Sequence, residues 1–352
     1  MMSTLKVDNT ADPFRMKIGF GLASLSEDSP IRLPTVFECA AHLTLLDAIV
    51  RMETDVGEWA TTKNIEKDVA WNAYCSAAAL RFLKWSQTAE TSDDKGAVPP
   101  LDILMVWHSY MLNTAAYQRY VKKFPEGRLG GKGIDWGEVY ERIGDDNRFN
   151  MSTKDQSSMD RLGLKLDLFT LLKNGELLNG NNGPISPPTS LKFDIVAAIQ
   201  RQLRFARKMH NAQWLFSQFA GDILESAIRR YEMFITLIGE RQGTPLAPTQ
   251  DIDLVWHTHQ LSPKRYGLYS AAMNNGAFIH HNDAIAEDRI QESFAAAKTL
   301  FRERFGRGYL VCYLQAAAIS IVAIDAAVPP AAVTKIGSMA ATPQEAAKVG
   351  LT

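Results

Sequence analysis

The sequence is poor in cysteine and has no excess of charge of either sign. Only three cysteines, Cys39, Cys75 and Cys312, occur in 352 residues. They are too few and too scattered for a disulfide framework or a thiolate zinc site. Lys and Arg number 38 against 39 Asp and Glu, a formal net charge of −1. Because neutralising phosphates requires a basic surface, this balance argues against a nucleic-acid partner.

Long hydrophobic runs are also missing. Residues 1–20 carry charges at positions 8, 12, 15 and 17 and lack an apolar centre, so we expect no secretory signal. The longest apolar stretch, residues 310–324, contains Gln315 and Ser320 and is too short to span a bilayer. The sequence therefore predicts a soluble, cytoplasmic protein with no membrane partner.

Apolar residues recur at helical spacing through most of the chain, which predicts an all-α fold. The predicted long helices cover residues 34–56, 65–88, 191–210, 212–239 and 284–305. The first two and the next two of these helices form two consecutive pairs, and between the pairs Gly, Asn and Pro are frequent over 127–188. We expect an irregular connection there, with one embedded helix near 157–173.

The most informative feature is an internal repeat. Residues 99–120 and 248–269 match at an offset of 149, and both copies contain a Trp-His pair. The nine identical pairs are Pro99/Pro248, Asp102/Asp251, Ile103/Ile252, Val106/Val255, Trp107/Trp256, His108/His257, Leu112/Leu261, Tyr117/Tyr266 and Tyr120/Tyr269. Each copy follows a pair of predicted helices. We therefore expect two helical halves, related by a pseudo-twofold axis, around a shared site; the alternative is that each half keeps its motif in its own core.

This repeat sets the predicted domain organisation. An N-terminal arm covers residues 1–33, and the first helical half covers 34–126. The irregular connection covers 127–189 and the second helical half 190–310. An apolar segment and tail follow at 311–352.

The duplicated Asp and His residues are candidate metal ligands. Asp102, His108, Asp251 and His257 offer two carboxylates and two imidazoles, a set that zinc accepts in a four-coordinate shell. Imidazole with carboxylate also suits iron or manganese. For Asp102 and Asp251 the alternative is a helix-capping role, because each follows proline at a predicted helix start.

Three further side chains lie beside these candidates. Asp253 and His257 are four residues apart and share one face of a helix. His259 points to another face, which favours proton transfer or an ordinary surface position, and Tyr110 is its counterpart in the first copy. His280 and His281, followed by Asp283, lie in a Gly-rich turn after the second motif; they are additional candidate ligands, and the alternative is that they are solvated loop residues.

The two motifs resemble those of the glycine-rich domain-containing-protein-like family. The resemblance is carried by Asp102–His108, by Asp251–Tyr266, which reads DIDLVWHTHQLSPKRY, and by the later Ile279–Asp283. In the first copy Leu104 replaces the acid of the motif and Tyr110 replaces its second histidine. This departure implies an asymmetric site specialised for a small molecule.

Stand-alone fungal members of that family resemble cyclopenase, and this implies a zinc-dependent lyase or isomerase of secondary metabolism. Such an enzyme contracts the ring of cyclopenin, an epoxidised benzodiazepinedione, to the quinolone viridicatin with loss of methyl isocyanate. In that chemistry, the groups that would transfer protons as general acids or bases are Asp253, His259 and Tyr110. The aromatic side chains expected to stack on such an alkaloid substrate are Trp107, Trp256 and Tyr266. For the two tryptophans the alternative is a role as core anchors beside the site. The alternative is a non-catalytic adaptor in which a structural metal or polar contacts join two helical halves.

Overall fold

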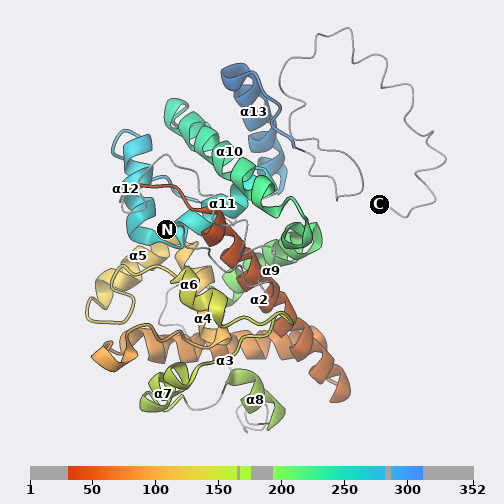
Figure 1. The fold of residues 1–352 in the computed structure, drawn as a ribbon, viewed down its shortest axis with the longest axis vertical. Helices are drawn as coiled ribbons and strands as arrows, with labels where there is room; N and C mark the ends of the chain where they lie inside the picture. Colours follow the sequence, from red (N-terminus) through yellow and green to blue (C-terminus); the bar gives the residue numbers. More distant parts are fainter. Residues whose placement is uncertain (1–30, 165–166, 176–192, 282–286, 312–352) are drawn as a thin grey trace, which may run out of the picture.

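A computed structural model describes residues 31–164, 167–175, 193–281 and 287–311. These residues are predominantly helical, as the sequence predicts (Figure 1). The helices of the first part are α2 (Val36–Thr62), α3 (Lys67–Gln87), α4 (Leu101–Met111), α5 (Thr114–Lys123), α6 (Trp136–Glu141), α7 (Thr153–Arg161) and α8 (Leu168–Lys173). Those of the second part are α9 (Ile195–Ala212), α10 (Ala220–Glu240), α11 (Gln250–Gln260), α12 (Pro263–Met273) and α13 (Glu287–Phe305). Short 3₁₀ turns lie at Ser92–Asp94 and Trp214–Phe216.

The predicted single helix near 157–173 is wrong. The structure has α7 and α8 there, and α6 lies earlier in the same connection. Gly163 follows α7 with φ of +65°, a conformation that glycine adopts without strain and that ends the helix. The predicted arm and the C-terminal tail lie almost entirely outside the described residues.

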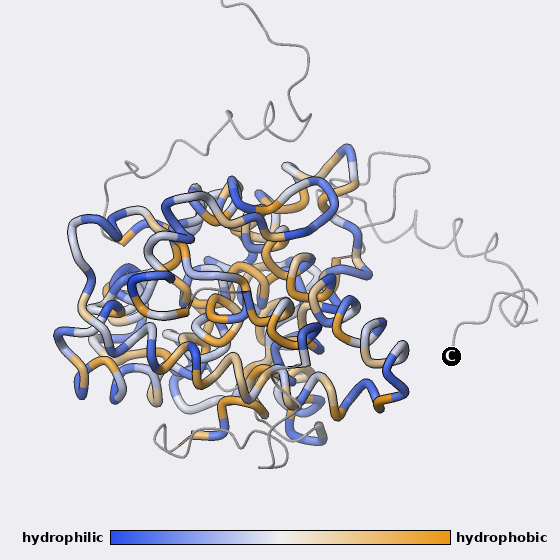
Figure 2. The backbone as a smooth tube through the Cα atoms, turned by 90° about the horizontal axis from the view of Figure 1, so that it is seen from below, coloured by the Kyte–Doolittle hydropathy of each residue, from blue (hydrophilic) through white to orange (hydrophobic). Residues whose placement is uncertain are grey.

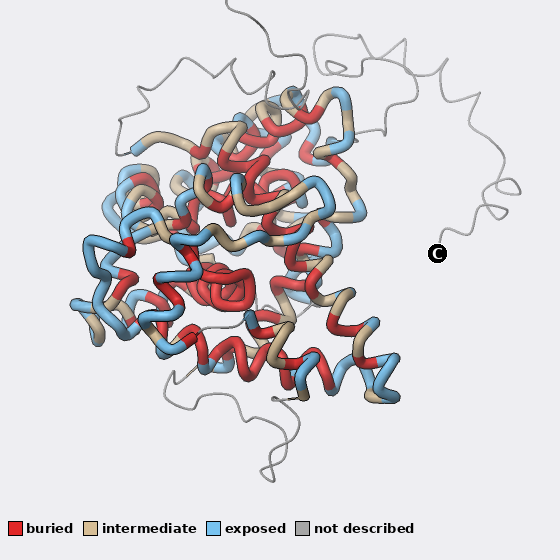
Figure 3. Tube along the Cα trace, turned by 60° about the horizontal axis from the view of Figure 1, so that its bottom comes forward, coloured by how far each residue is buried: buried red, intermediate tan, exposed pale blue. Residues whose placement is uncertain are grey.

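Helices α2 and α9 lie at the centre of the molecule and contribute to both of its hydrophobic cores. The first core joins the middle of α2 to α3, α4, α5 and the start of α9. The second joins the start of α2 and the end of α9 to α10, α11, α12 and α13. Apolar turns accordingly face inward in Figure 2, and the buried residues gather centrally in Figure 3. The two central helices therefore hold the two parts of the chain together.

The long helix α2 is fixed at its N-terminus by a capping box and by two arginines. The Thr35 hydroxyl accepts a hydrogen bond from the Glu38 backbone N–H, and the Glu38 carboxylate accepts one from the Thr35 N–H. Arg32 and Arg265 of α12 also bind this carboxylate, at 2.9 and 2.8 Å. The start of α2 is thereby tied to the second half of the chain.

The order of helices repeats along the chain. Helices α4 and α11 begin and end at equivalent positions 149 residues apart, and α5 and α12 also begin at this offset. A buried Arg–Asp pair joins α3 to α4, Arg81 to Asp102 at 2.7 Å, and its equivalent joins α10 to α11, Arg230 to Asp251 at 2.6 Å. The structure thus repeats contacts as well as sequence, while the pseudo-twofold axis stays a prediction.

Within the described residues, no helix has the length and apolar composition that crossing a membrane requires.

Candidate metal centre

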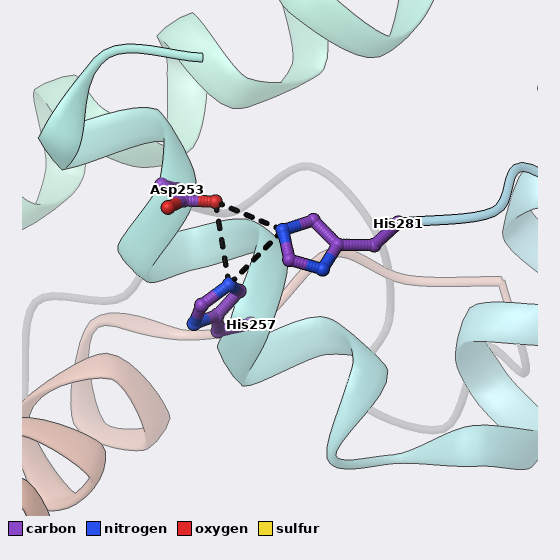
Figure 4. Close-up of side chains that lie close together, drawn as sticks. All are labelled: Asp253, His257 and His281. Carbon is purple, nitrogen blue, oxygen red and sulfur yellow. Dashed lines mark hydrogen bonds and ion pairs between the residues drawn. The ribbon is translucent and has the colours of Figure 1, made fainter. Parts of the chain in front are cut away.

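Three side chains of the second half converge on one point (Figure 4). The Nε2 atoms of His257 and His281 lie 3.2 Å apart. The Asp253 Oδ1 atom lies 3.4 Å from the His257 nitrogen and 3.5 Å from the His281 nitrogen. We call these three residues the metal cluster; they are the one group of three or more candidate ligands that converges within the described parts of the chain.

The spacing of the three donor atoms fits a tetrahedral zinc ion. Zinc binds imidazole nitrogen and carboxylate oxygen at about 2.0–2.2 Å, so neighbouring ligand atoms around a tetrahedral ion are about 3.3–3.6 Å apart. Right-angled octahedral neighbours at the same bond lengths would lie closer, at about 2.8–3.1 Å. The observed 3.4 and 3.5 Å lie within the tetrahedral range, and the 3.2 Å between the two nitrogens lies between the two ranges.

Local structure explains how two ligands come from one helix. Asp253 lies in the first turn of α11 and His257 one turn later, so both project from the same face. The His257 side chain is only 2% exposed, whereas that of Asp253 is 23% exposed. The Phe205 ring packs on His257 at a centroid distance of 4.4 Å. The cluster is thus closed on the His257 side, and the Asp253 Oδ1 atom that belongs to it is also buried, so the exposed part of Asp253 lies beyond this oxygen.

The third ligand is placed by a chain of hydrogen bonds. The indole N–H of Trp256 donates to the Tyr266 hydroxyl at 2.8 Å, and this hydroxyl donates to the Ile279 carbonyl at 2.7 Å. His281 follows two residues later, and its ring meets the Trp256 ring edge-on at 4.9 Å. Trp256 and Tyr266, predicted as substrate contacts, are buried and hold the His281 segment against α11.

The charge on Asp253 suits a metal ligand. Burial alone would raise the pKa of this carboxyl, but the neighbouring His257 and His281, with a smaller contribution from Lys208, lower it below its usual value. Asp253 is therefore a carboxylate at neutral pH, and it gives the cluster a hard anionic donor beside two imidazoles.

Asp102 and Asp251 do not join the metal cluster. Each lies in the first turn of its helix and pairs with a buried arginine, so neither is the N-cap residue that the sequence also suggested. Burial raises the pKa of Asp102 even though Arg81 is paired to it. Both aspartates instead link neighbouring helices inside the protein.

His108, the counterpart of His257, contacts a third histidine rather than the cluster. The Thr258 hydroxyl donates to the Leu254 carbonyl at 2.8 Å, so its oxygen accepts the Nδ1–H of His42 at 2.9 Å. His42 Nε2 is then an acceptor for the Nε2–H of His108 at 3.0 Å. Burial and the nearby charge of His257 lower the pKa of His108 to about 3. Within the described residues, these fully buried imidazoles join α4, α2 and α11 as neutral groups.

His259 and Tyr110 occupy equivalent, fully buried positions. His259 accepts or donates a hydrogen bond through Nδ1 to the Tyr231 hydroxyl at 3.0 Å and packs against Tyr266 and Tyr269. Tyr110 packs edge-on against Phe82, the counterpart of Tyr231, at 6.0 Å. The geometry brings neither residue into the metal cluster.

The sequence indicates His281 only as an additional candidate ligand. Its signal was the His280–His281 pair after the second motif, but a turn of this kind does not reveal which way a side chain points. His280 is exposed and lies 3.5 Å from the Thr114 hydroxyl of α5. Asp283 lies outside the described residues.

Fold and cluster together define a class: an α-helical protein with an internal repeat and a His–His–Asp centre in its second half. Residues 138–268 match the model of the family described as "Glycine-rich domain-containing protein-like". This region includes Asp253 and His257. Part of the chain is thus similar to this family, and the resemblance predicted from the sequence is confirmed.

Two curated relatives from Arabidopsis thaliana support the assignment. The chain is 27% identical to Glycine-rich domain-containing protein 1 over 237 residues, which is 65% of this chain and 27% of that protein. It is 29% identical to Glycine-rich domain-containing protein 2 over 223 residues, which is 60% of this chain and 26% of that protein. The chain thus matches about a quarter of the length of each relative. No solved structure matches it significantly.

Proposed function

We propose that the protein is a zinc-dependent lyase or isomerase of secondary metabolism, with a reaction of the cyclopenase kind on an epoxidised benzodiazepinedione. The observation that carries the proposal is the metal cluster, whose three donor atoms lie 3.2–3.5 Å from one another, close enough to bind one ion. Catalytic zinc sites have three protein ligands and keep a position for water or substrate, whereas structural sites use four. Among the described residues, the cluster offers three.

The residues around the cluster have distinct tasks in this proposal. When bound, zinc would act as a Lewis acid that polarises a substrate oxygen. His257 and His281 would hold the ion through their Nε2 atoms, and Asp253 would hold it through its carboxylate. Because Asp253 is the most exposed of the three, substrate approaches from its side. Phe205 and Trp256, which contact the histidine rings, exclude water from the opposite side.

The burial of His259 and Tyr110 argues against the proton-transfer roles expected for them. Each ring lies among tyrosine rings and is at most 1% exposed. A general acid or base must come within about 3 Å of the proton that it transfers, directly or through one water. We therefore assign both residues to the protein interior, and Asp253 to metal binding.

The test combines metal analysis with an assay of the substrate class. Purified protein should contain one zinc per chain, and chelation should abolish the turnover of cyclopenin until zinc is restored. His257→Ala should remove both metal and turnover. His108→Ala is the matched control at the equivalent position, and it should keep the metal.

Two results would contradict the proposal. Zinc retained at full stoichiometry in His257→Ala would exclude the metal cluster as the site. Stoichiometric zinc without turnover of any epoxidised benzodiazepinedione would instead favour the adaptor with a structural metal.

A further inference from the structure

A cleft of about 660 Å³ lies between the first half and α12 of the second half, apart from the metal cluster. Its walls come from the end of α3, the segment before α4, α4 itself, the 128–135 segment and the first turns of α12. Small-molecule sites have volumes of about 300–1,000 Å³, so this cleft has the size of an organic ligand. None of the three residues of the metal cluster lines it.

The cleft occupies the position that corresponds to the metal cluster in the repeat. At the offset of 149, Leu104 is the counterpart of Asp253, and Lys132 is the counterpart of His281. Both Leu104 and Lys132 line the cleft. At these positions the first half thus has an apolar residue and a cation where the second half has two of the three residues of the metal cluster.

A missing hydrogen bond explains why the space stays open. Tyr117 accepts the indole N–H of Trp107 at 3.2 Å, as Tyr266 does from Trp256. In the described residues, however, no hydrogen bond runs from Tyr117 to the 130–132 segment. This segment is drawn toward the end of α11, where the Ile134 N–H donates to the Leu261 carbonyl at 3.0 Å. The cleft therefore lies at the position where, in the second half, the segment with Ile279 and His281 packs against α11.

The walls suit a flat apolar group. The rings of Trp85 and Trp107, 5.3 Å apart, both line the cleft. Leu268 of α12 also lines it and is 44% exposed, so it offers apolar surface to a ligand. An aromatic ligand would remove these surfaces from water.

The charges around the cleft suit an anion. Five cationic side chains line it against the carboxylates of Glu90 and Asp135; the cations are Lys95, Arg128, Lys132, Lys264 and Arg265.

Three of these cations are already paired. Arg128 pairs with Asp94, Lys132 with Glu90 and Arg265 with Glu38. Lys95 and Lys264 are exposed and have no ion-pair partner within the described parts of the chain. These two lysines are therefore available to an anionic ligand.

We propose that this cleft binds an organic anion with a flat aromatic body, of the aromatic carboxylate class. The ring lies against Trp85, Trp107 and Leu268, and the carboxylate faces Lys95 and Lys264. The site is separate from the metal cluster, so it does not rest on the proposed zinc chemistry.

Calorimetric titration with naphthalene-2-carboxylate tests the proposal. The full-length protein should bind one equivalent, and its neutral analogue 2-naphthylmethanol should bind about tenfold more weakly. The double variant Lys95→Ala/Lys264→Ala should lose about tenfold in affinity for the carboxylate and little for the alcohol. Lys298→Ala, which changes an exposed lysine of α13, is the control and should match the wild type.

A second comparison separates the cleft from the metal cluster. Binding should be unchanged after chelation and in His257→Ala, because no metal ligand lines the cleft. Loss of binding on chelation would assign the carboxylate to the metal cluster and overturn the proposal. Equal affinity for the acid and the alcohol, or equal affinity in the double variant and the wild type, would overturn it as well.

Discussion

The two halves of the repeat keep the same supporting contacts but differ in their sites. Both have the Arg–Asp pair between consecutive helices and the Trp–Tyr hydrogen bond. Where the second half has the metal cluster, the first has Leu104, His108 and Lys132. The buried pairs hold helices together, so both halves need them, whereas a ligand set can change without loss of the scaffold. Residues that are identical in the two copies therefore maintain the fold, whereas residues that differ between the copies determine what each site can bind.

The largest effect is expected from the duplicated ion pair. Arg230→Met removes the buried arginine that pairs with Asp251, which costs about 3–5 kcal/mol of the free energy of unfolding. It also removes hydrogen bonds from Arg230 to Thr249 and to the Tyr309 carbonyl, at 3.2 and 2.6 Å. Arg81→Met should cost about 1–2 kcal/mol less, because Arg81 Nη2 has no partner among the described residues.

Denaturant unfolding of both variants measures this difference. The double variant Arg81→Met/Asp102→Leu is the control, and it should recover part of the loss because no unpaired charge remains. Equal losses for the two single variants would refute the asymmetry between the halves.

Breaking the hydrogen bond between Tyr231 and His259 should have a smaller effect on the free energy of unfolding. Tyr231→Phe leaves His259 Nδ1 buried without its hydrogen bond, which costs about 1–3 kcal/mol. Tyr231→Phe/His259→Tyr recreates the Phe82/Tyr110 pair of the first half and should lose less than Tyr231→Phe alone. Urea unfolding measures the free energy of unfolding of the variants. A double variant less stable than Tyr231→Phe would show that the surroundings of His259 and Tyr110 are not interchangeable.

The sequence predicts much of the fold because amphipathic spacing and an internal repeat are local patterns. Most of the long helices lie close to their predicted bounds, but Gly163 divides the predicted 157–173 helix. The metal ligands were harder to predict. Asp102 and Asp251 are duplicated carboxylates, as metal ligands could be, but in the structure each forms a buried ion pair with an arginine. Their arginine partners lie 21 residues earlier, on a preceding helix, and only tertiary structure brings the partners together.

The tyrosine of each motif provides the next comparison. Tyr266→Phe removes the hydrogen bonds that connect Trp256 to the Ile279 carbonyl, so His281 is held less firmly. Losing such support around a metal ligand weakens metal affinity by at least about tenfold. The matched change Tyr117→Phe should leave zinc affinity unchanged. Competition with a chromophoric chelator measures both, and equal affinities would exclude this positioning role.

The smallest effect concerns His42, the side chain that links the halves through His108 and Thr258. Burial, together with the neighbouring His108 and His257, lowers the pKa of His42 well below its usual range, so the folded protein keeps it neutral. An unfolded imidazole titrates near pH 6.5, so the unfolded state takes up a proton that the folded state does not as the pH falls. The stabilising contribution is therefore present above about pH 6.5 and is lost below it, by about 0.8 kcal/mol between pH 7.5 and pH 6.0. His42→Asn, whose amide can still donate to Thr258, should flatten the pH dependence of the free energy of unfolding by this amount. Identical pH dependence in His42→Asn and wild type would mean that His42 is protonated inside the fold.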